Sequence, residues 1–373
     1  MAGIYIHIPF CRSRCIYCGF YSTTSLGLRQ RYVDAVCREM QIRATETACA
    51  DTIYLGGGTP SQLSIQQLRQ LFDALYIYNK VGNDAEVTIE VNPDDVTAEF
   101  AAALGQLPVN RVSMGAQTFA DDRLKFLHRR HTAAQVSEAV QRLRAAGIGN
   151  ISIDLMYGFP GETLSDWQHD IYSAIALDVE HLSAYCLMIE EGTPLYERLE
   201  CRPNTLSVTL PDEELERTMY ETLIDRLEKA GFEHYEISNF AKKGFRSRHN
   251  SSYWTGIPYL GLGAAAHSYD GKSRSWNVAD IHQYMEGIER GERPFESEEL
   301  DADTRYNDMV TVALRTCEGL DLSQLSEKHR DYCQKNARRF VDDGLVRHEG
   351  SHLVLTRKGL FVSDMIMSEL IFI

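Results

Sequence analysis

Three cysteines lie within eight residues near the start of the chain, at Cys11, Cys15 and Cys18. Three thiolates on one short loop can bind three irons of a [4Fe–4S] cluster, and the fourth iron then stays open to an exchangeable ligand. A zinc site would need a fourth Cys or His close by. His7 is near in sequence, but it falls in a predicted strand that would hold it beside the sheet. The spacing therefore favours an iron–sulfur cluster over zinc or over three unrelated thiols.

The cysteine loop follows the first of six short apolar runs that alternate with amphipathic stretches. The runs predict strands at residues 4–8, 52–55, 86–91, 111–114, 151–155 and 181–187, and the stretches predict helices at 29–45, 64–76, 97–104, 133–146 and 164–177. Such alternation is typical of βαβ units, whose right-handed crossovers curl a parallel sheet. We therefore predict an α/β fold with an open six-stranded parallel barrel, in which ligands bind at the carboxyl ends of the strands.

The alternation ends after residue 190. Residues 211–230 predict a polar-faced helix, residues 235–274 are rich in Gly and aromatic side chains, and the charged residues 291–299 indicate a linker. The remainder predicts three helices, a hairpin at 345–348 and 353–356, and a last helix, an order that resembles a winged helix. We expect a partial barrel at 1–190, its extension at 191–290, and a smaller helical, winged-helix-like C-terminal domain at 295–373.

The cysteine spacing after the first predicted strand resembles that of the radical S-adenosylmethionine (SAM) superfamily. Tyr17 matches the aromatic residue that is common between the second and third cysteines, and residues 56–60 read GGGTP, like the family's glycine motif after the second strand. Glycines let the backbone approach a ligand closely, so that backbone groups can hold the amino and carboxylate ends of the methionine moiety. The resemblance implies a radical SAM barrel that binds a [4Fe–4S] cluster and SAM.

Further matches to the superfamily stand at the ends of the later predicted strands. A buried carboxylate on a barrel strand needs a partner, and ribose hydroxyls or a sulfonium cation would supply one. Structural ion pairs are the alternative for Glu90, Arg129 and Asp154. The resemblance implies that the cluster is held by Cys11, Cys15 and Cys18, and that the following residues line the cofactor site: Tyr5, Tyr17, Gly57, Gly58, Thr59, Glu90, Gln117, Arg129 and Asp154.

Within the superfamily, the chain is similar to the oxygen-independent coproporphyrinogen III oxidase group, which includes the HemW-type haem chaperones. The oxidases carry a further cysteine two residues after the third, where Phe20 stands here. They also carry an N-terminal extension, whereas the first predicted strand here begins close to Met1. Both departures favour a haem chaperone over an oxidase.

Residues 249–254 read HNSSYW and match the HNxxYW pattern of the haem chaperones. The imidazole of His249 can ligate haem iron, and Tyr253 and Trp254 can border the porphyrin face. The alternative is that His249 is structural and makes its hydrogen bonds within a turn. Three functions stay open: a haem chaperone that also holds a cluster and SAM, a radical enzyme acting on a porphyrinogen, and a radical SAM enzyme or methyltransferase with another substrate.

The composition bears on the partners and the location of the protein. The chain has 373 residues and a net charge of 38 − 53 = −15, which argues against nucleic acid as a partner. No apolar run approaches the ~20 residues that cross a bilayer, and no signal peptide is evident. We expect a cytoplasmic protein without stable membrane insertion. Its expected partners are haem, an unidentified haem-acceptor protein and an electron donor such as flavodoxin or ferredoxin.

The chain has nine cysteines and no export signal, so a disulfide framework is not expected. Six of them lie in separate predicted elements, away from the three-cysteine loop. We expect that these six are dispensable for the cluster: Cys37, Cys49, Cys186, Cys201, Cys317 and Cys333.

Overall fold

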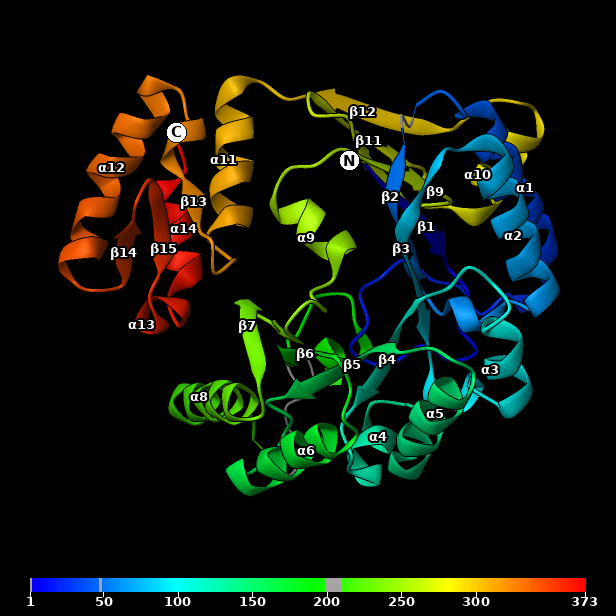
Figure 1. Ribbon diagram of the computed structural model, residues 1–373, viewed down its shortest axis with the longest axis horizontal. Coiled ribbons are helices and arrows are strands. Elements are labelled where there is room, and N and C mark those ends of the chain that lie inside the picture. The colour runs from blue at the N-terminus through cyan, green and yellow to red at the C-terminus, as the bar shows by residue number, and fades with distance from the viewer. Residues whose placement is uncertain (1, 47–48, 199–208) are drawn as a thin grey trace.

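The computed structural model describes residues 2–46, 49–198 and 209–373. Its centre is a twelve-stranded sheet in the order β12-β11-β10-β9-β1-β2-β3-β4-β5-β6-β8-β7. The strands from β1 to β6 pair in parallel with their neighbours, which confirms the predicted parallel core. These strands are β1 (Gly3–Ile8), β2 (Ala50–Gly57), β3 (Val81–Val91), β4 (Arg111–Gln117), β5 (Asn150–Tyr157) and β6 (His181–Cys186). Among the described residues the sheet stays open between β12 and β7 (Figure 1).

Helices connect the parallel strands and cover the outer face of the sheet (Figure 1). They are α1 (Arg29–Ile42), α2 (Ile65–Tyr78), α3 (Ala98–Leu104), α4 (Asp121–Phe126), α5 (Ala133–Ala145) and α6 (Leu164–Ala176). The local sequence explains where they start: Ser64 and Gln67 form a capping box at the beginning of α2. Leu68, Leu71 and Leu75 follow at helical spacing and are fully buried, so one face of α2 packs onto the sheet.

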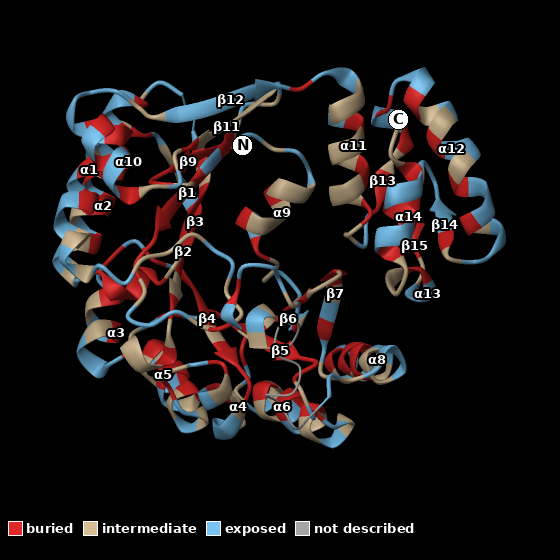
Figure 2. Cartoon of the chain, turned by 180° about the vertical axis from the view of Figure 1, so that it is seen from behind, coloured by how far each residue is buried: buried red, intermediate tan, exposed pale blue. Residues whose placement is uncertain are grey.

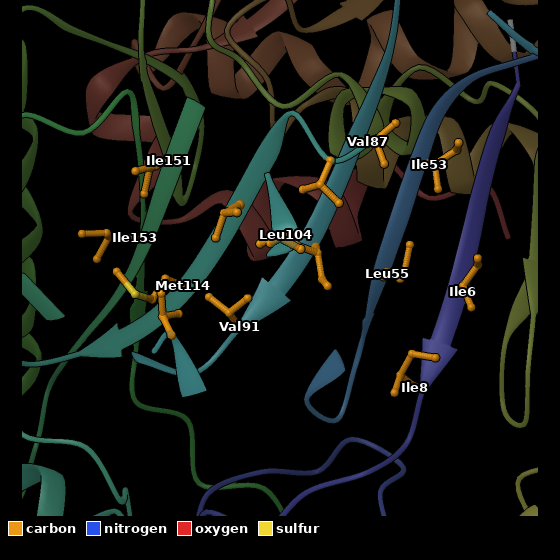
Figure 3. Packing of buried hydrophobic residues seen from close by; sticks show 14 of the residues in the cluster. Ile6, Ile8, Ile53, Leu55, Val87, Val91, Leu104, Met114, Ile151 and Ile153 are labelled. Atoms are coloured by element: carbon orange, nitrogen blue, oxygen red, sulfur yellow. The ribbon is translucent and has the colours of Figure 1, made fainter. Parts of the chain in front are cut away.

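Buried aliphatic side chains from neighbouring strands form one continuous core. Figure 3 shows Ile6, Ile53, Val87, Met114 and Ile153, one from each of the first five strands, in this cluster. Each is at most 2% exposed. Burying such a side chain stabilises the fold by ~2 kcal/mol. The core therefore holds the carboxyl ends of the strands in fixed relative positions, and the loops that leave them inherit that geometry.

Four strands extend the sheet beyond β1, and two extend it beyond β6. Strand β9 pairs in parallel with β1, and the strands after it pair antiparallel. The added elements are α7 (Pro194–Tyr196), α8 (Glu213–Lys229), β7 (Phe232–Glu236), β8 (Asn239–Lys242), α9 (Arg248–Trp254), β9 (Tyr259–Leu262), β10 (His267–Tyr269), β11 (Ser273–Asn277), α10 (Ile281–Glu289) and β12 (Phe295–Glu299). This extension comes from the segment in which the sequence showed little periodicity.

The prediction of a linker over residues 291–299 is wrong in its second half. Residues Phe295–Glu299 form β12, which pairs with β11 in the large sheet. All five residues of β12 are exposed (Figure 2). An edge strand that carries charged side chains protects the sheet from pairing with other chains, and its composition resembles that of a linker. Composition alone therefore could not distinguish an edge strand from a linker.

The last part of the chain has its own hydrophobic cluster and its own three-stranded sheet, β13-β15-β14. Figure 1 shows its elements gathered to one side of the large sheet. They are α11 (Ala302–Ala313), β13 (Leu320–Asp321), α12 (Glu327–Asp342), β14 (Val346–Glu349), β15 (His352–Leu355), α13 (Arg357–Leu360) and α14 (Ser363–Leu370). The predicted hairpin is present. Instead of three helices before it, the described residues have two, with β13 and a short 3-10 turn between them.

No helix in the described ranges is both long enough and apolar enough to cross a membrane.

Candidate cofactor site at the carboxyl ends of the strands

A cavity of about 680 Å³ lies where the parallel strands end. Loops after β1 and β2 form one side of it, and residues of β3 to β6 form the other. Among the site residues expected from the sequence, Tyr5, His249, Tyr253 and Trp254 do not line this cavity. The lining residues from that set are Cys11, Cys15, Cys18, Tyr17, Gly57, Gly58, Thr59, Glu90, Gln117, Arg129 and Asp154.

The cysteine loop is anchored on both sides of its three thiols. The backbone N–H of Cys11 donates to the carbonyl of Thr23 at 2.9 Å, so the start and end of the loop are joined. In the middle of the loop, Ile16 is buried. Its backbone N–H donates to the carbonyl of Leu127, and its carbonyl accepts from the backbone N–H of Leu195. These contacts fix a loop that has little regular structure. The cysteines on either side of Ile16 are therefore held toward the cavity.

The three thiols suit a [4Fe–4S] cluster better than a zinc ion. They are free and half-buried, and Cys11 Sγ lies 3.6 Å from Thr59 Oγ1. Within the described ranges, no three His, Cys, Asp or Glu side chains are arranged to hold a single metal ion. A cluster does not require that arrangement, because each thiolate binds a different iron. The donor set therefore fits the group that the cysteine spacing predicts.

The glycines after β2 are required by the close approach of two loops. Gly57 has a φ of +109°, a left-handed conformation that glycine adopts without strain. At Gly58, an added Cβ would lie 2.8 Å from the backbone of Pro9 and 2.9 Å from that of Ile8. Backbone atoms cannot move aside as a flexible side chain can. The glycines therefore let the turn after β2 pack against the end of β1, and this packing brings Thr59 next to Cys11.

Two partly buried carboxyl groups face the cavity from β3 and β5. Glu90 accepts hydrogen bonds from the hydroxyl of Tyr54 at 2.8 Å and from the backbone N–H of Gly57 at 3.1 Å. Asp154 lies 3.5 Å from the hydroxyl of Ser113. Burial raises the pKa of Glu90 to about 7 and that of Asp154 to about 6. A cationic ligand in the cavity would favour the ionised form of both groups.

Gln117 and Arg129 complete the side of the cavity formed by β4. The register with β5 shifts between Gly115 and Gln117, and Gln117 has a φ of +67°. Such a bulge redirects a side chain at a strand end. The Arg129 guanidinium donates to the side-chain oxygen of Asn92 at 2.8 Å and lies 3.6 Å from Cys15 Sγ. Arg129 therefore joins the end of β3 to the cysteine loop.

Comparison with known proteins places this architecture in a family. The model of the radical SAM superfamily matches residues 5–171, and that of the HemN C-terminal domain matches residues 300–362. The heme chaperone HemW of Bacillus subtilis is 36% identical, with 98% of this chain and 97% of that protein aligned. The heme chaperone HemW of Lactococcus lactis is 34% identical over 95% of this chain and 93% of that protein. This chain belongs to the HemW family of radical SAM proteins.

The fold of this HemW-family protein is also that of a solved structure. Coproporphyrinogen III oxidase (HemN) from Escherichia coli, described as a radical SAM enzyme, matches with a TM-score of 0.84. The alignment covers 99% of this chain and 90% of the oxidase, at 22% identity. At that identity the likeness supports the fold and not the activity.

Tyr5 does not reach the cavity in this HemW-family structure. Its hydroxyl is hydrogen-bonded to His7 Nδ1 at 3.0 Å, and its ring stacks on Tyr54 with centroids 6.2 Å apart. Tyr54 in turn donates to Glu90. The structure therefore gives Tyr5 a supporting position behind the cavity wall instead of the direct cofactor contact that the sequence suggested.

His249 is also placed differently from the expectation. Its side chain is 1% exposed and does not line the cavity. Nδ1 is hydrogen-bonded to Thr52 Oγ1 at 2.9 Å, Nε2 is hydrogen-bonded to the Tyr253 hydroxyl at 2.9 Å, and the ring stacks on Tyr54. Burial lowers its pKa to about 3. Both ring nitrogens are engaged, so this arrangement supports the structural alternative; ligation of haem iron would require one of these bonds to break.

Sequence reasoning missed several residues of the cavity wall. Arg111 and Ser113 precede Gln117 on β4 at multiples of two residues, so all three belong to the side of the strand that faces the cavity. Asn250 follows His249 on α9. The two-residue alternation of side chains in a strand is the signal that could have found Arg111 and Ser113, counted backward from Gln117. No such signal was available for Asn250, because α9 reaches the cavity only through tertiary packing.

Proposed function

We propose that this protein binds haem as its cargo and delivers it to an acceptor protein. The observation that carries this proposal is the similarity, over nearly the whole chain, to proteins named heme chaperones. The likeness to the oxidase HemN is at 22% identity and supports only the shared fold. Binding and transfer of haem require a surface for a flat apolar macrocycle with two carboxylates, and the cavity offers suitable features.

Exposed apolar side chains at the cavity suit a porphyrin face. Phe20 is 71% exposed, Met188 is 67% exposed and Tyr185 is 43% exposed, and all three line the cavity. Aromatic and thioether side chains gain contact area against a flat ring system. Phe20 stands where the oxidase group carries its further cysteine, so this position adds apolar contact here instead of a thiol. These residues support a haem that docks at the cavity.

The same cavity suits a [4Fe–4S] cluster and SAM as resident cofactors. When bound, the cluster supplies the electron for reductive cleavage of SAM, as is general for radical SAM chemistry. Cys11, Cys15 and Cys18 would hold the cluster, and the turn at Gly57 would place backbone groups against the methionine moiety. Glu90 and Asp154 offer carboxylates to the cationic and hydroxyl groups of SAM. The protein's part is to bind, orient and desolvate.

The net charge and the proposed cofactors bear on the partners and the location of the protein. The net charge of −15 disfavours nucleic acid as a partner. We assign the protein to the cytoplasm, with an electron donor such as flavodoxin or ferredoxin to reduce its cluster. The haem acceptor is a second protein.

The test separates a chaperone from an oxidase in one preparation. The cluster is reconstituted anaerobically, SAM and a reduced flavodoxin are added, and haem or coproporphyrinogen III is supplied in parallel. The proposal expects haem to be bound and recovered unmodified, with coproporphyrinogen III left intact. Catalytic decarboxylation of coproporphyrinogen III would replace the chaperone function by an oxidase function.

A further inference from the structure

Arg111 is a buried cation in the wall of the cavity, and two of its nitrogen atoms have no hydrogen-bond partner. It is the first residue of β4, its side chain is 1% exposed, and it lines the cavity. Its Nε and Nη1 atoms are buried and make no hydrogen bond, and within the described residues no carboxylate forms an ion pair with it. Glu90 and Asp154 balance its charge at longer range, since Arg111 lowers the pKa of both, but buried N–H groups without an acceptor cost free energy. A residue of this kind indicates an anionic ligand.

The acidic groups of the cavity do not satisfy Arg111. The Glu90 carboxylate is already bonded to Tyr54 and Gly57, and Asp154 lies beside Ser113. Burial is the largest effect on both carboxyl groups and raises the pKa of each, and Arg111 lowers it as a smaller effect without a hydrogen bond. The guanidinium therefore has hydrogen-bond donors left for a further carboxylate.

Asn250 presents a second polar side chain to the same cavity. It lies on α9, which is fixed by His249: the backbone N–H of His249 donates to Glu86 at 3.0 Å, and its ring is bonded to Thr52. The backbone N–H of Asn250 is capped by Ser247, while its side-chain amide makes no hydrogen bond to any described residue. The HNxxYW segment thus places an amide donor, and not an imidazole, in the wall of the cavity.

We propose that Arg111 and Asn250 form a carboxylate site that binds a propionate of the haem cargo. Arg111 lies at the amino end of β4, deeper in the barrel than Gln117 at the other end of the strand. A haem that enters edge-on would direct its carboxylates toward Arg111 and its apolar edge toward Phe20 and Met188. This inference rests on the proposed function, and it names the residues that would orient the cargo.

The test compares haem with haem dimethyl ester, which has no free carboxylate. Affinities are measured by titration for the reconstituted wild type and for Arg111→Gln, Arg111→Lys and Asn250→Ala. The wild type is expected to bind haem about 10-fold tighter than the ester, as the loss of a charge-assisted hydrogen bond would give. Arg111→Gln should lose this preference while its cluster content stays unchanged. Arg111→Lys, which keeps the charge, should retain part of it, and Asn250→Ala should weaken haem but not ester binding.

The control is Arg290→Gln, which removes an exposed arginine whose side chain is 64% exposed. It should bind haem and the ester as the wild type does, and thermal unfolding of each variant reports whether it is folded. If Arg111→Gln still prefers haem over its ester, the carboxylate site is overturned while the chaperone function stands.

Coproporphyrin III, an iron-free porphyrin with four propionates, separates the remaining outcomes. If the wild type binds it but not haem, and Arg111→Gln weakens that binding, the carboxylate site stands and the haem cargo does not. If the wild type binds neither porphyrin, both proposals are overturned.

Discussion

The carboxylate of Glu90 accepts a hydrogen bond from the backbone N–H of Gly57 at 3.1 Å. This bond ties the end of β3 to the turn after β2, and the same turn packs against the start of the cysteine loop. The proposed contacts to the cluster and to SAM are therefore mechanically connected. A change at either residue is expected to disturb more than its own contact.

SAM affinity should depend on the ionisation of Glu90. Burial raises its pKa to about 7, so a large share of the carboxyl is protonated at pH 6. SAM carries cationic groups that favour the carboxylate, so its affinity should increase as pH rises from about 6 to about 8. Glu90→Gln should bind SAM more weakly and with less pH dependence. Calorimetric titration across this pH range checks the prediction, and the same steep increase in Glu90→Gln would exclude Glu90 as its origin.

The same raised pKa predicts how stability changes with pH in the absence of ligands. A carboxyl whose folded pKa lies above its unfolded value of 4.5 favours the folded state at low pH. That contribution is lost as pH rises from about 4.5 to about 7. Urea unfolding should show a smaller loss of stability over this interval in Glu90→Gln than in the wild type; equal losses would contradict the assignment.

Gly58→Ala should disturb the cysteine loop. The added methyl group would meet backbone atoms of Ile8 and Pro9, which cannot give way without moving the loop. We expect a loss of stability of about 1–3 kcal/mol, typical of overpacking, and a lower iron content after reconstitution. Gly27→Ala is the matched control, because nothing lies within 4 Å of its added Cβ. A Gly58→Ala protein with wild-type iron content and stability would show that the close approach is not needed.

Iron content should depend on the three loop cysteines and not on a fourth thiol nearby. Cys186 also lines the cavity, and burial raises the pKa of its thiol to about 12. Cys15→Ala should therefore abolish the [4Fe–4S] absorption, whereas Cys186→Ala should retain it. The reverse result would move the cluster to another site. Cys201 lies outside the described residues, and its expected dispensability is a prediction from sequence alone.

His249→Ala should destabilise the protein before any haem is added. The change removes two side-chain hydrogen bonds and a stack on Tyr54, which together stabilise by about 2–3 kcal/mol. Chemical unfolding, with the exposed His282→Ala as control, measures this loss. Unchanged stability would contradict the structural role. The prediction that His249 ligates haem iron is checked on the same variant, since a ligand loss changes the haem absorption spectrum.

The parallel core and the cofactor loop could be predicted because their signals are local. Apolar strands alternate with amphipathic helices, and the cysteines and glycines follow directly after strands. The helix predicted at 211–230 is present as α8, but the strands of the extension could not be predicted, since β9 pairs with β1 across more than 250 residues and its segment has no clear period. The structural roles of Tyr5 and His249 could not be predicted from the sequence either. Whether a side chain faces the cavity or supports its wall depends on packing between distant segments.

An equilibrium titration of the reconstituted protein with haem, followed by the haem absorption band, tests the central claim most directly. A haem chaperone is expected to show saturable binding of one haem per chain while it keeps its iron–sulfur cluster. Haem that associates without saturation, or not at all, would contradict it.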